Sequence, residues 1–209
     1  KDPDERKVGR AVSNAVIELA LASIPGFFAV SGGPGPGKPY GVYRPALVPA
    51  ELVPQRVSVL GGDRTVVESV APDGEVEVTA VAGPDVPSPD GPTVEVPIGR
   101  VVGARSGDKG GNANLGVFAR TDEAWAWLDE FLTVERLQAL LPESAPLAVD
   151  RHRLANLRSL HFVINGLLQE GVAASTRQDG QAKSLGEWLR ARVVPVPASL
   201  LDDTDPSGS

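Results

Sequence analysis

The sequence of 209 residues contains no cysteine, no methionine and few aromatic residues, which are three Trp, two Tyr and five Phe. Without cysteine, the chain cannot form a disulfide, a thiolate nucleophile, an iron–sulfur cluster or a cysteine-based zinc site, and the cytoplasm is the expected compartment. Its two histidines, His152 and His161, lack the spacing of metal ligands, so we expect no metal site. A Gly-x-Ser-x-Gly motif is also absent, and nothing supports serine hydrolase chemistry.

A strong positive charge and long apolar runs are missing as well. The net charge is −7, and residues 93–199 carry twelve acidic and twelve basic side chains. Because nucleic-acid binding needs clustered Lys and Arg that neutralise phosphates, we expect no nucleic-acid partner. No stretch approaches the roughly 20 apolar residues that cross a bilayer, so we expect no membrane partner. The composition favours small molecules or other proteins as partners.

Glycine and proline are abundant, with 23 and 19 residues, and they indicate where regular structure stops. The clearest linker covers residues 83–92, which prolines stiffen. We therefore predict a first region over residues 1–82, this linker, a domain over residues 93–197 and a disordered acidic tail over residues 198–209. Because the chain has no methionine to begin it, we also expect a fragment or separate subunit whose first helix belongs to a larger N-terminal domain.

In the first region, apolar residues at helical spacing from Val8 to Leu19 predict an amphipathic helix that ends before Pro25. The segment from Gly32 to Lys38 has the spacing of a phosphate-binding P-loop, but a proline follows it. Proline lacks both the hydroxyl that would hold magnesium and the N–H that a following helix would direct at phosphate. We therefore expect an irregular packing loop, followed by short strands at Val57–Leu60, Thr65–Val70 and Glu75–Ala82.

The remaining sequence alternates between strand and helix patterns, which predicts an α+β fold. The runs Thr93–Arg105 and Asn114–Arg120 have strand composition, and a helix is expected to start at Thr121 and to reach Pro142. The other expected elements are a second helix over Leu157–Gln169, a strand over Val172–Arg177, a short helix over Ser184–Leu189 and a final strand over Val193–Val196. Two helices against one small antiparallel sheet indicate a ferredoxin-like or related split arrangement.

The segment between the first two of these strands is the densest in functional side chains. Residues 104–116 hold two cations, a carboxylate, a hydroxyl, two amides and four glycines. Glycines let the backbone approach a ligand and present N–H groups to an anion, while arginine can grip a carboxylate or phosphate with two donors. We predict Asp108 and Lys109 as catalytic residues. The predicted ligand-binding residues are Arg105, Ser106, Gly107, Gly110, Gly111, Asn112 and Asn114.

Alternatives stay open for these residues and for the polar residues that follow them. The glycine-rich segment can also be a plain hairpin turn, with Asp108 to Gly111 as the turn. His161, which lies among apolar residues, fits either a packing residue or a proton-transfer group. The later basic residues fit a solvated face, unless the chain folds back and brings one or two of them to the predicted site; they are Arg151, Arg153, Arg158, Arg177 and Lys183.

Residues 104–117, Ala-Arg-Ser-Gly-Asp-Lys-Gly-Gly-Asn-Ala-Asn-Leu-Gly-Val, resemble the signature of the AtuA family of acyclic terpene utilisation proteins. That signature reads Ala-Arg-Ser-Gly-Asp-Lys-Gly with a trailing Asn-Ile-Gly-Val. Residues 157–168 and 180–186 are similar to later blocks of the family, and residues 25–43 resemble the close of its large N-terminal domain. The similar blocks lie within residues 9–196.

The resemblance implies a ferredoxin-like C-terminal domain, preceded by the helical and extended tail of a large N-terminal domain that this chain lacks. It also implies a role in the breakdown of citronellol-type or related branched compounds as CoA thioesters. We therefore expect a component that binds an anionic acyl-CoA ligand through residues 105–114, with hydratase or lyase chemistry if it is catalytic. No cofactor is identified, and the CoA thioester is the expected substrate.

The alternative function is a non-catalytic module that assembles a larger enzyme complex. Under either hypothesis the expected protein partner is the missing N-terminal domain or subunit, in a homo-oligomer or hetero-oligomer. The expected small-molecule partner is an anion. A ligand that is held only when the partner is present would favour the assembly module or a shared site.

Overall fold

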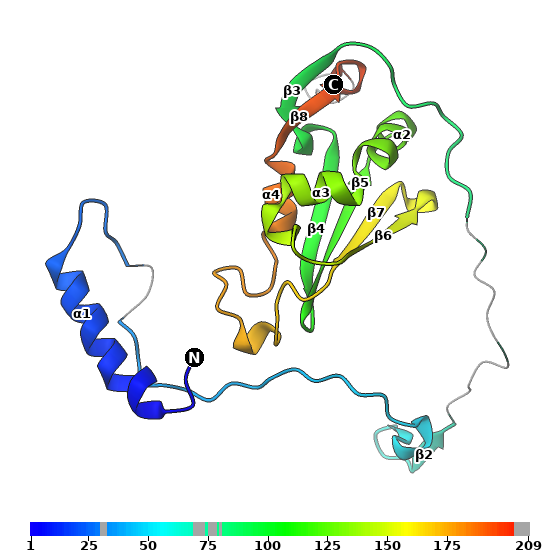
Figure 1. Ribbon diagram of the computed structural model, residues 1–209. Coiled ribbons are helices and arrows are strands. Elements are labelled where there is room, and N and C mark those ends of the chain that lie inside the picture. Colours follow the sequence, from blue (N-terminus) through cyan, green and yellow to red (C-terminus); the bar gives the residue numbers. More distant parts are fainter. Residues whose placement is uncertain (30–32, 69–73, 75–78, 80, 203–209) are drawn as a thin grey trace. The chain divides into compact units, whose positions relative to one another are not determined.

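The computed structural model describes residues 1–29, 33–68, 74, 79 and 81–202 (Figure 1). Contacts divide the chain into two units, Lys1–Gly41 and Val42–Ser209. Helices and antiparallel strands are both present, so the predicted α+β class is confirmed. The domain boundary over residues 83–92 stays a prediction. In the structure Gly83 packs within the second unit, where a Cβ at this position would be 2.6 Å from Ala155 Cβ and 3.3 Å from Trp125 Nε1.

The first unit contains the predicted N-terminal helix. A π-helical turn at Lys7–Ala11 leads into α1, Val12–Ala22, and the chain leaves the helix at Ser23 with a positive φ of 53°. The Ser13 hydroxyl donates to the Pro34 carbonyl oxygen at 3.0 Å. Residues 38–49 have no regular structure, so the described chain lacks the helix that a P-loop places after its lysine.

A small hairpin follows at the start of the second unit. Strands β1, Gln55–Ser58, and β2, Arg64–Val67, pair in antiparallel register, and the turn between them contains Gly61 at a φ of 80°. The first two expected strands are therefore present, close to their predicted positions, and glycine tolerates the positive φ that the tight turn between them requires. The third expected strand, at residues 75–82, lies largely outside the described residues.

The main domain contains a four-stranded antiparallel sheet with the order β4-β5-β7-β6. Its strands are β4 (Val102–Lys109), β5 (Asn112–Ala119), β6 (Val149–Leu154) and β7 (Ser159–Ile164). A separate antiparallel pair joins β3, Thr93–Pro97, to β8, Val193–Pro197. The strand run expected over residues 93–105 is therefore divided. Pro97 ends β3 and a short 3₁₀ turn at Ile98–Arg100 separates it from β4, because proline cannot donate to a strand ladder.

Three helices lie over one side of this sheet (Figure 1): α2 (Asp122–Phe131), α3 (Val134–Leu140) and α4 (Leu185–Arg190). The Thr121 hydroxyl accepts from the Ala124 N–H and caps α2 at the predicted start. The predicted first helix is broken in two, because a second cap forms where the Thr133 hydroxyl accepts from the Arg136 N–H. None of the described helices combines the length and apolar character needed to cross a lipid bilayer.

The helix predicted over residues 157–169 is wrong, because the segment forms β7 and a turn. Its buried residues alternate, with Leu160, Phe162 and Ile164 completely buried and the residues between them partly exposed. That period of two is the strand period, and the apolar density of the run concealed it. The strand expected over residues 172–177 is also wrong, since its first three residues form a 3₁₀ turn, Val172–Ala174.

The core lies between the helices and one face of the sheet, which we call the helix face. Strands β5 and β7 supply its centre, and the side chains packed there include Leu115, Val117, Leu160, Phe162, Trp125, Leu128 and Leu137. The opposite side, which we call the open face, carries the alternate residues of each strand. Those residues are Gly103, Arg105, Gly107 and Lys109 on β4, Asn112, Asn114, Gly116 and Phe118 on β5, Ser159, His161 and Val163 on β7, and Asp150, His152 and Leu154 on β6.

The end of the domain differs in part from the predicted tail. Helix α5, Ser199–Asp202, follows β8 directly, and Leu200 is buried. The Ala198 N–H donates to the Pro92 carbonyl oxygen at 3.0 Å, which ties this segment to the start of β3. Residues 203–209 of the predicted tail lie outside the described residues.

Candidate functional site

The segment expected to form a functional loop is a tight hairpin instead. Strands β4 and β5 pair without interruption from Val102↔Ala119 to Lys109↔Asn112, and only Gly110 and Gly111 form the turn. Both glycines have packing reasons. Gly110 has a φ of +64° and a Cβ there would be 2.4 Å from Tyr43 Cε1, while a Cβ on Gly111 would be 2.3 Å from the Gln169 carbonyl oxygen. The hairpin alternative therefore describes the backbone of this segment.

Strand alternation separates the predicted site residues into two groups. Arg105, Lys109, Asn112 and Asn114 lie together on the open face, because β4 and β5 pair 105 with 116, 107 with 114 and 109 with 112. Ser106 and Asp108 are the intervening residues and point to the helix face. The two residues predicted to be catalytic, Asp108 and Lys109, consequently lie on opposite sides of β4, and their catalytic assignment stays a prediction.

Two of the predicted ligand-binding residues make structural hydrogen bonds. The Ser106 hydroxyl donates to the Lys183 carbonyl oxygen at 3.3 Å and accepts from the Gly186 N–H at 2.9 Å. These bonds attach the start of α4 to β4, which is an edge strand of the sheet. Asn112 Oδ1 accepts from the Gly166 N–H at 2.9 Å and fixes the turn after β7. Their side chains are therefore engaged within the domain.

The attachment of α4 brings Lys183 to the open face. A Cβ built on Gly107 would lie 3.5 Å from Lys183 Nζ and 3.7 Å from Asn114 Oδ1, so the ammonium group and the amide flank this glycine. Two of the later basic residues considered for the site, Arg177 and Lys183, follow β7. Lys183 does reach Gly107. Arg177 instead pairs with Glu143 at 2.7 Å. Gly107 keeps the space between the two side chains free.

The cations of the domain divide into paired and unpaired groups. Five arginines have carboxylate partners: Arg151 and Arg153 with Asp129, Arg158 with Asp122, Arg177 with Glu143, and Arg190 with Glu187. Among the described residues no ion pair joins a carboxylate to Arg105, Lys109 or Lys183. On the open face these three cations therefore have no described ion pair, although Asp150 on β6 lies on the same face and accepts from Asn165 Nδ2 at 2.8 Å. A cluster of cations without ion pairs is typical of anion sites.

Two histidines outside the predicted site residues extend this face, and one of them is His161, for which the sequence left a proton-transfer role open. His161 on β7 lies directly opposite His152 on β6 and opposite Gly116 on β5. The two imidazole centroids are 6.2 Å apart. Burial lowers the pKa of His161, and the nearby positive charges of His152 and Lys109 lower that pKa further. The sequence signal for this position was the alternation of Leu160, Phe162 and Ile164, which places the residues between them on one face.

The open face also has an apolar border. The Phe118 ring lies over Gly103, where a Cβ would be 2.2 Å from Phe118 Cζ, and the phenylalanine remains 40% exposed. Leu154 on β6 is 38% exposed. Within the described part of the chain, no group of three or more His, Asp or Glu side chains is placed to hold a metal ion. The face therefore offers cations, amides and imidazoles beside apolar surface.

Residues 96–195 match the model of the AtuA ferredoxin-like domain family. No curated protein and no solved structure matches the chain. The matched residues run from the end of β3 to the centre of β8 and include the whole four-stranded sheet, the three helices that cover it and every open-face residue named above. The C-terminal portion of this chain, residues 96–195, therefore belongs to the AtuA ferredoxin-like domain family.

Proposed function

We propose that the open face binds the anionic part of an acyl-CoA ligand, as a component of an AtuA-like protein that acts on acyclic terpene or other branched acyl compounds. The observation that carries this proposal is the position of Lys183. Lys183 is distant in sequence from Arg105 and Lys109, yet its ammonium group lies beside Gly107, which is on the same strand as those two residues. Three unpaired cations on one strand and its border suit a ligand that carries several phosphate oxygens.

The neighbouring groups supply geometry as well as charge. The Asn114 amide lies beside Gly107 and adds a neutral donor and acceptor. Gly107 and Gly116 have no side chains, so a ligand can approach the backbone of β4 and β5 between the cations. Arg105 lies directly opposite Gly116 in the register and can reach across this space. A phosphate group or a thioester carbonyl would meet these donors together.

If the domain is catalytic, His161 and Lys109 are the acid–base groups that share the open face. The lowered pKa of His161 keeps its imidazole neutral near neutral pH, so it can accept a proton. Proton removal beside a thioester carbonyl is the step common to hydratases and lyases that act on acyl-CoA compounds. The carbonyl would be polarised by the adjacent cations. Asp108 would then act from the helix face by positioning β4.

A non-catalytic assembly role is the second candidate, and the apolar border supports it. Phe118 and Leu154 are two exposed large apolar side chains of the open face, and exposed apolar surface beside polar groups is typical of protein interfaces. The occupant would be the N-terminal AtuA-type domain, as a separate subunit or as another part of the same assembly. In that case the cations would pair with carboxylates of the partner.

Calorimetric titration of the full chain with CoA and with pantetheine tests the first proposal. CoA should bind and pantetheine, which lacks the phosphates, should bind much more weakly. Arg105→Ala or Lys183→Ala should weaken CoA binding by about 1.5–3 kcal/mol, the range for hydrogen bonds to charged groups. Arg136→Ala is the matched control, because this exposed arginine lies on α3 and removes the same charge elsewhere.

Equal affinities for CoA and pantetheine, or equal losses in the control and the two variants, would contradict the anion site. The assembly role would gain if the chain alone bound no CoA and Phe118→Ala weakened association with an AtuA-type N-terminal domain. Sedimentation of the mixed proteins measures that association directly.

A further inference from the structure

A cavity lies beside α4, and none of the open-face residues lines it. Its volume is about 610 Å³, which lies within the size range of small-molecule sites. The lining residues are Glu143, Arg177, Gln178, Asp179, Ser184, Leu185 and Trp188. They come from three separate segments, which are the 3₁₀ turn after α3, the loop before α4 and α4 itself.

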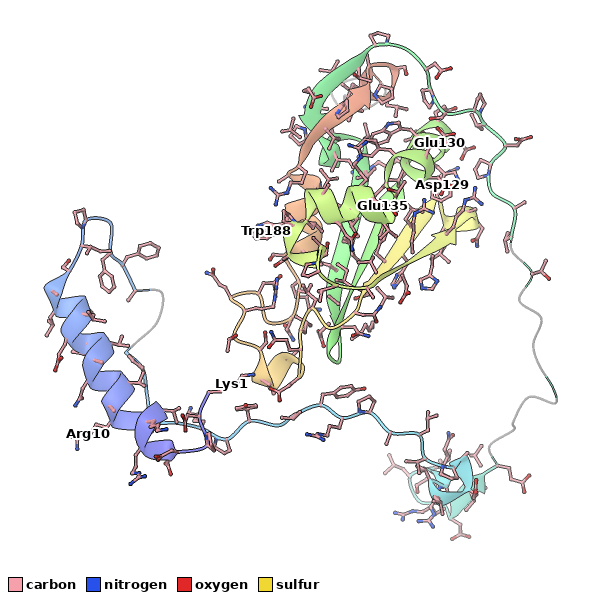
Figure 2. The ribbon with its side chains drawn as sticks, viewed as in Figure 1. Lys1, Arg10, Asp129, Glu130, Glu135 and Trp188 are labelled. Atoms are coloured by element: carbon pink, nitrogen blue, oxygen red, sulfur yellow. The ribbon has the colours of Figure 1, made fainter. Side chains whose placement is uncertain are left out.

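The aromatic wall of this cavity is exposed, unlike the other tryptophans of the chain. Trp188 is 53% exposed, whereas Trp125 and Trp127 are 1% and 6% exposed. Its side chain projects from α4 away from the sheet (Figure 2). The Arg192 guanidinium carbon lies over this ring, 5.7 Å from its centroid. Burying an indole is strongly favourable, so the part of the tryptophan that remains exposed at the cavity provides a surface on which a planar ring can stack.

The charged side chains of the cavity are already engaged in an ion pair or in hydrogen bonds, in contrast to the cations of the open face. Arg177 Nη2 donates to Glu143 Oε2 at 2.7 Å, so guanidinium and carboxylate neutralise each other. Asp179 accepts from the Lys183 N–H at 2.8 Å, the Ser184 N–H at 2.9 Å and the Ser184 hydroxyl at 2.7 Å, and these bonds shape the loop. The cavity therefore favours an uncharged ligand over a phosphate.

The polar side chains that line the cavity offer donors and acceptors together. Arg177 carries guanidinium N–H donors and Glu143 carries carboxylate acceptors. The exposed Gln178 amide, which also lines the cavity, carries one acceptor and two donors. A planar nitrogen heterocycle has the same mixture of donors and acceptors around its edge and an apolar face for the indole.

We propose that this cavity binds an uncharged nucleobase, and specifically a purine such as the adenine ring, stacked on Trp188. The purine would lie on the indole with its edge toward Glu143, Arg177 and Gln178. Adenine occurs in free nucleotides and at one end of CoA, and the shared chemistry is the ring. The inference goes beyond the proposed function, because it depends on different side chains and needs no phosphate.

Adenosine is the probe, because it carries the base and no phosphate. In ¹⁵N-labelled full-length chain, adenosine should shift the amide signals of Arg177, Gln178 and Ser184 and the indole signal of Trp188. Trp188→Ala should weaken adenosine binding about tenfold or more, while Trp188→Tyr should retain most of it, since stacking on an aromatic side chain drives the affinity. Arg105→Ala should leave adenosine binding unchanged.

Further titrations with CoA, AMP and ribose show which adenine compound is bound and whether the base itself is recognised. Tighter binding of CoA than of adenosine, with the excess lost in Lys183→Ala, would support CoA as the source, whereas equal gains with AMP would support a free nucleotide. Absence of adenosine shifts at these positions, binding of ribose as strong as that of adenosine, or unchanged affinity in Trp188→Ala would overturn the proposal. An unchanged melting temperature for Trp188→Ala excludes loss of fold as the cause.

Discussion

The two faces of the four-stranded sheet differ in whether their positively charged side chains form ion pairs. Toward the helix face, Arg151 and Arg153 share Asp129 at the end of α2, which Figure 2 labels, and Arg151 also donates to the Leu132 carbonyl oxygen. On the open face, Arg105 and Lys109 have no described ion pair. On the helix face the ion pairs join α2 to the sheet, so we expect them to stabilise the fold. Arg105 and Lys109 make no described ion pair that would join the open face to another element, so we expect them to contribute little to stability.

The largest difference between the faces should appear when buried apolar side chains are shortened. Phe162→Ala should lower the free energy of unfolding by roughly 3–5 kcal/mol, because its completely buried ring leaves a cavity in the core. Urea denaturation measures this loss. Val117→Ala on the helix face and Val163→Ala on the open face form the matched pair. An equal loss for the two valines would show that the open face is covered in solution.

Breaking the shared ion pair should cost less. Asp129→Asn removes the charge that holds Arg151 at 2.8 Å and also contacts Arg153. The unfolding free energy should fall by about 1–3 kcal/mol, since the partly buried guanidinium of Arg151 and the exposed one of Arg153 both lose a charged acceptor. Arg105→Ala should change it by less than about 0.5 kcal/mol, the range for surface substitutions. Chemical denaturation at low and high salt measures both losses. A larger loss for Arg105→Ala than for Asp129→Asn would contradict this comparison of the two faces.

Alanine substitution of two glycines, one in the hairpin turn and one on the open face, gives a further comparison. Gly111→Ala should destabilise the domain by about 1–3 kcal/mol, because its Cβ would meet the Gln169 carbonyl oxygen at 2.3 Å and backbone must shift. Gly116→Ala meets only Arg105 O at 3.8 Å, so its melting temperature should stay near that of the parent protein. The second variant should instead weaken CoA binding. Thermal melts and CoA titrations of both variants would reveal any reversal.

The smallest effect should be a pH dependence from His161. Its folded-state pKa is lowered below 6.5, because burial and the charges of His152 and Lys109 disfavour the imidazolium. The unfolded chain therefore binds more protons in the window just below pH 6.5, and stability should be complete above it and fall as the pH drops through it. His161→Gln should flatten this slope. An identical slope in the variant would assign the dependence to other groups.

The sequence predicted those parts of the fold that depend on local chemistry. Thr121 followed by acidic residues located the start of α2, and short β-patterned runs located strands β1 and β2 to within a few residues. The predictions failed where long-range pairing decides the structure. Residues 159–164 are apolar enough to fit a helix, and only pairing with β5 and β6 selects the strand.

The site was predictable to a similar extent. The signature residues could be identified along the chain, but their division between two faces required the strand register. Lys183 could be considered only as one of several later basic residues, because nothing local to it indicates Gly107 as its neighbour. The Trp188 cavity was not predicted, since it joins three segments that are separate in the sequence.

The two border strands of the sheet have different protection against pairing with another chain. Along β4, the segment that starts α4 is attached through Ser106. Within the described chain, the backbone of strand β6 has no hydrogen bond beyond those to β7, but the strand presents Asp150, Arg151, His152 and Arg153 in succession. Four consecutive ionisable residues oppose the parallel, in-register addition of an identical strand, because like charges would then meet across the new ladder. Self-association of this domain is therefore expected to use its faces, and fibril-like growth through β6 is disfavoured at concentrations where the domain remains folded.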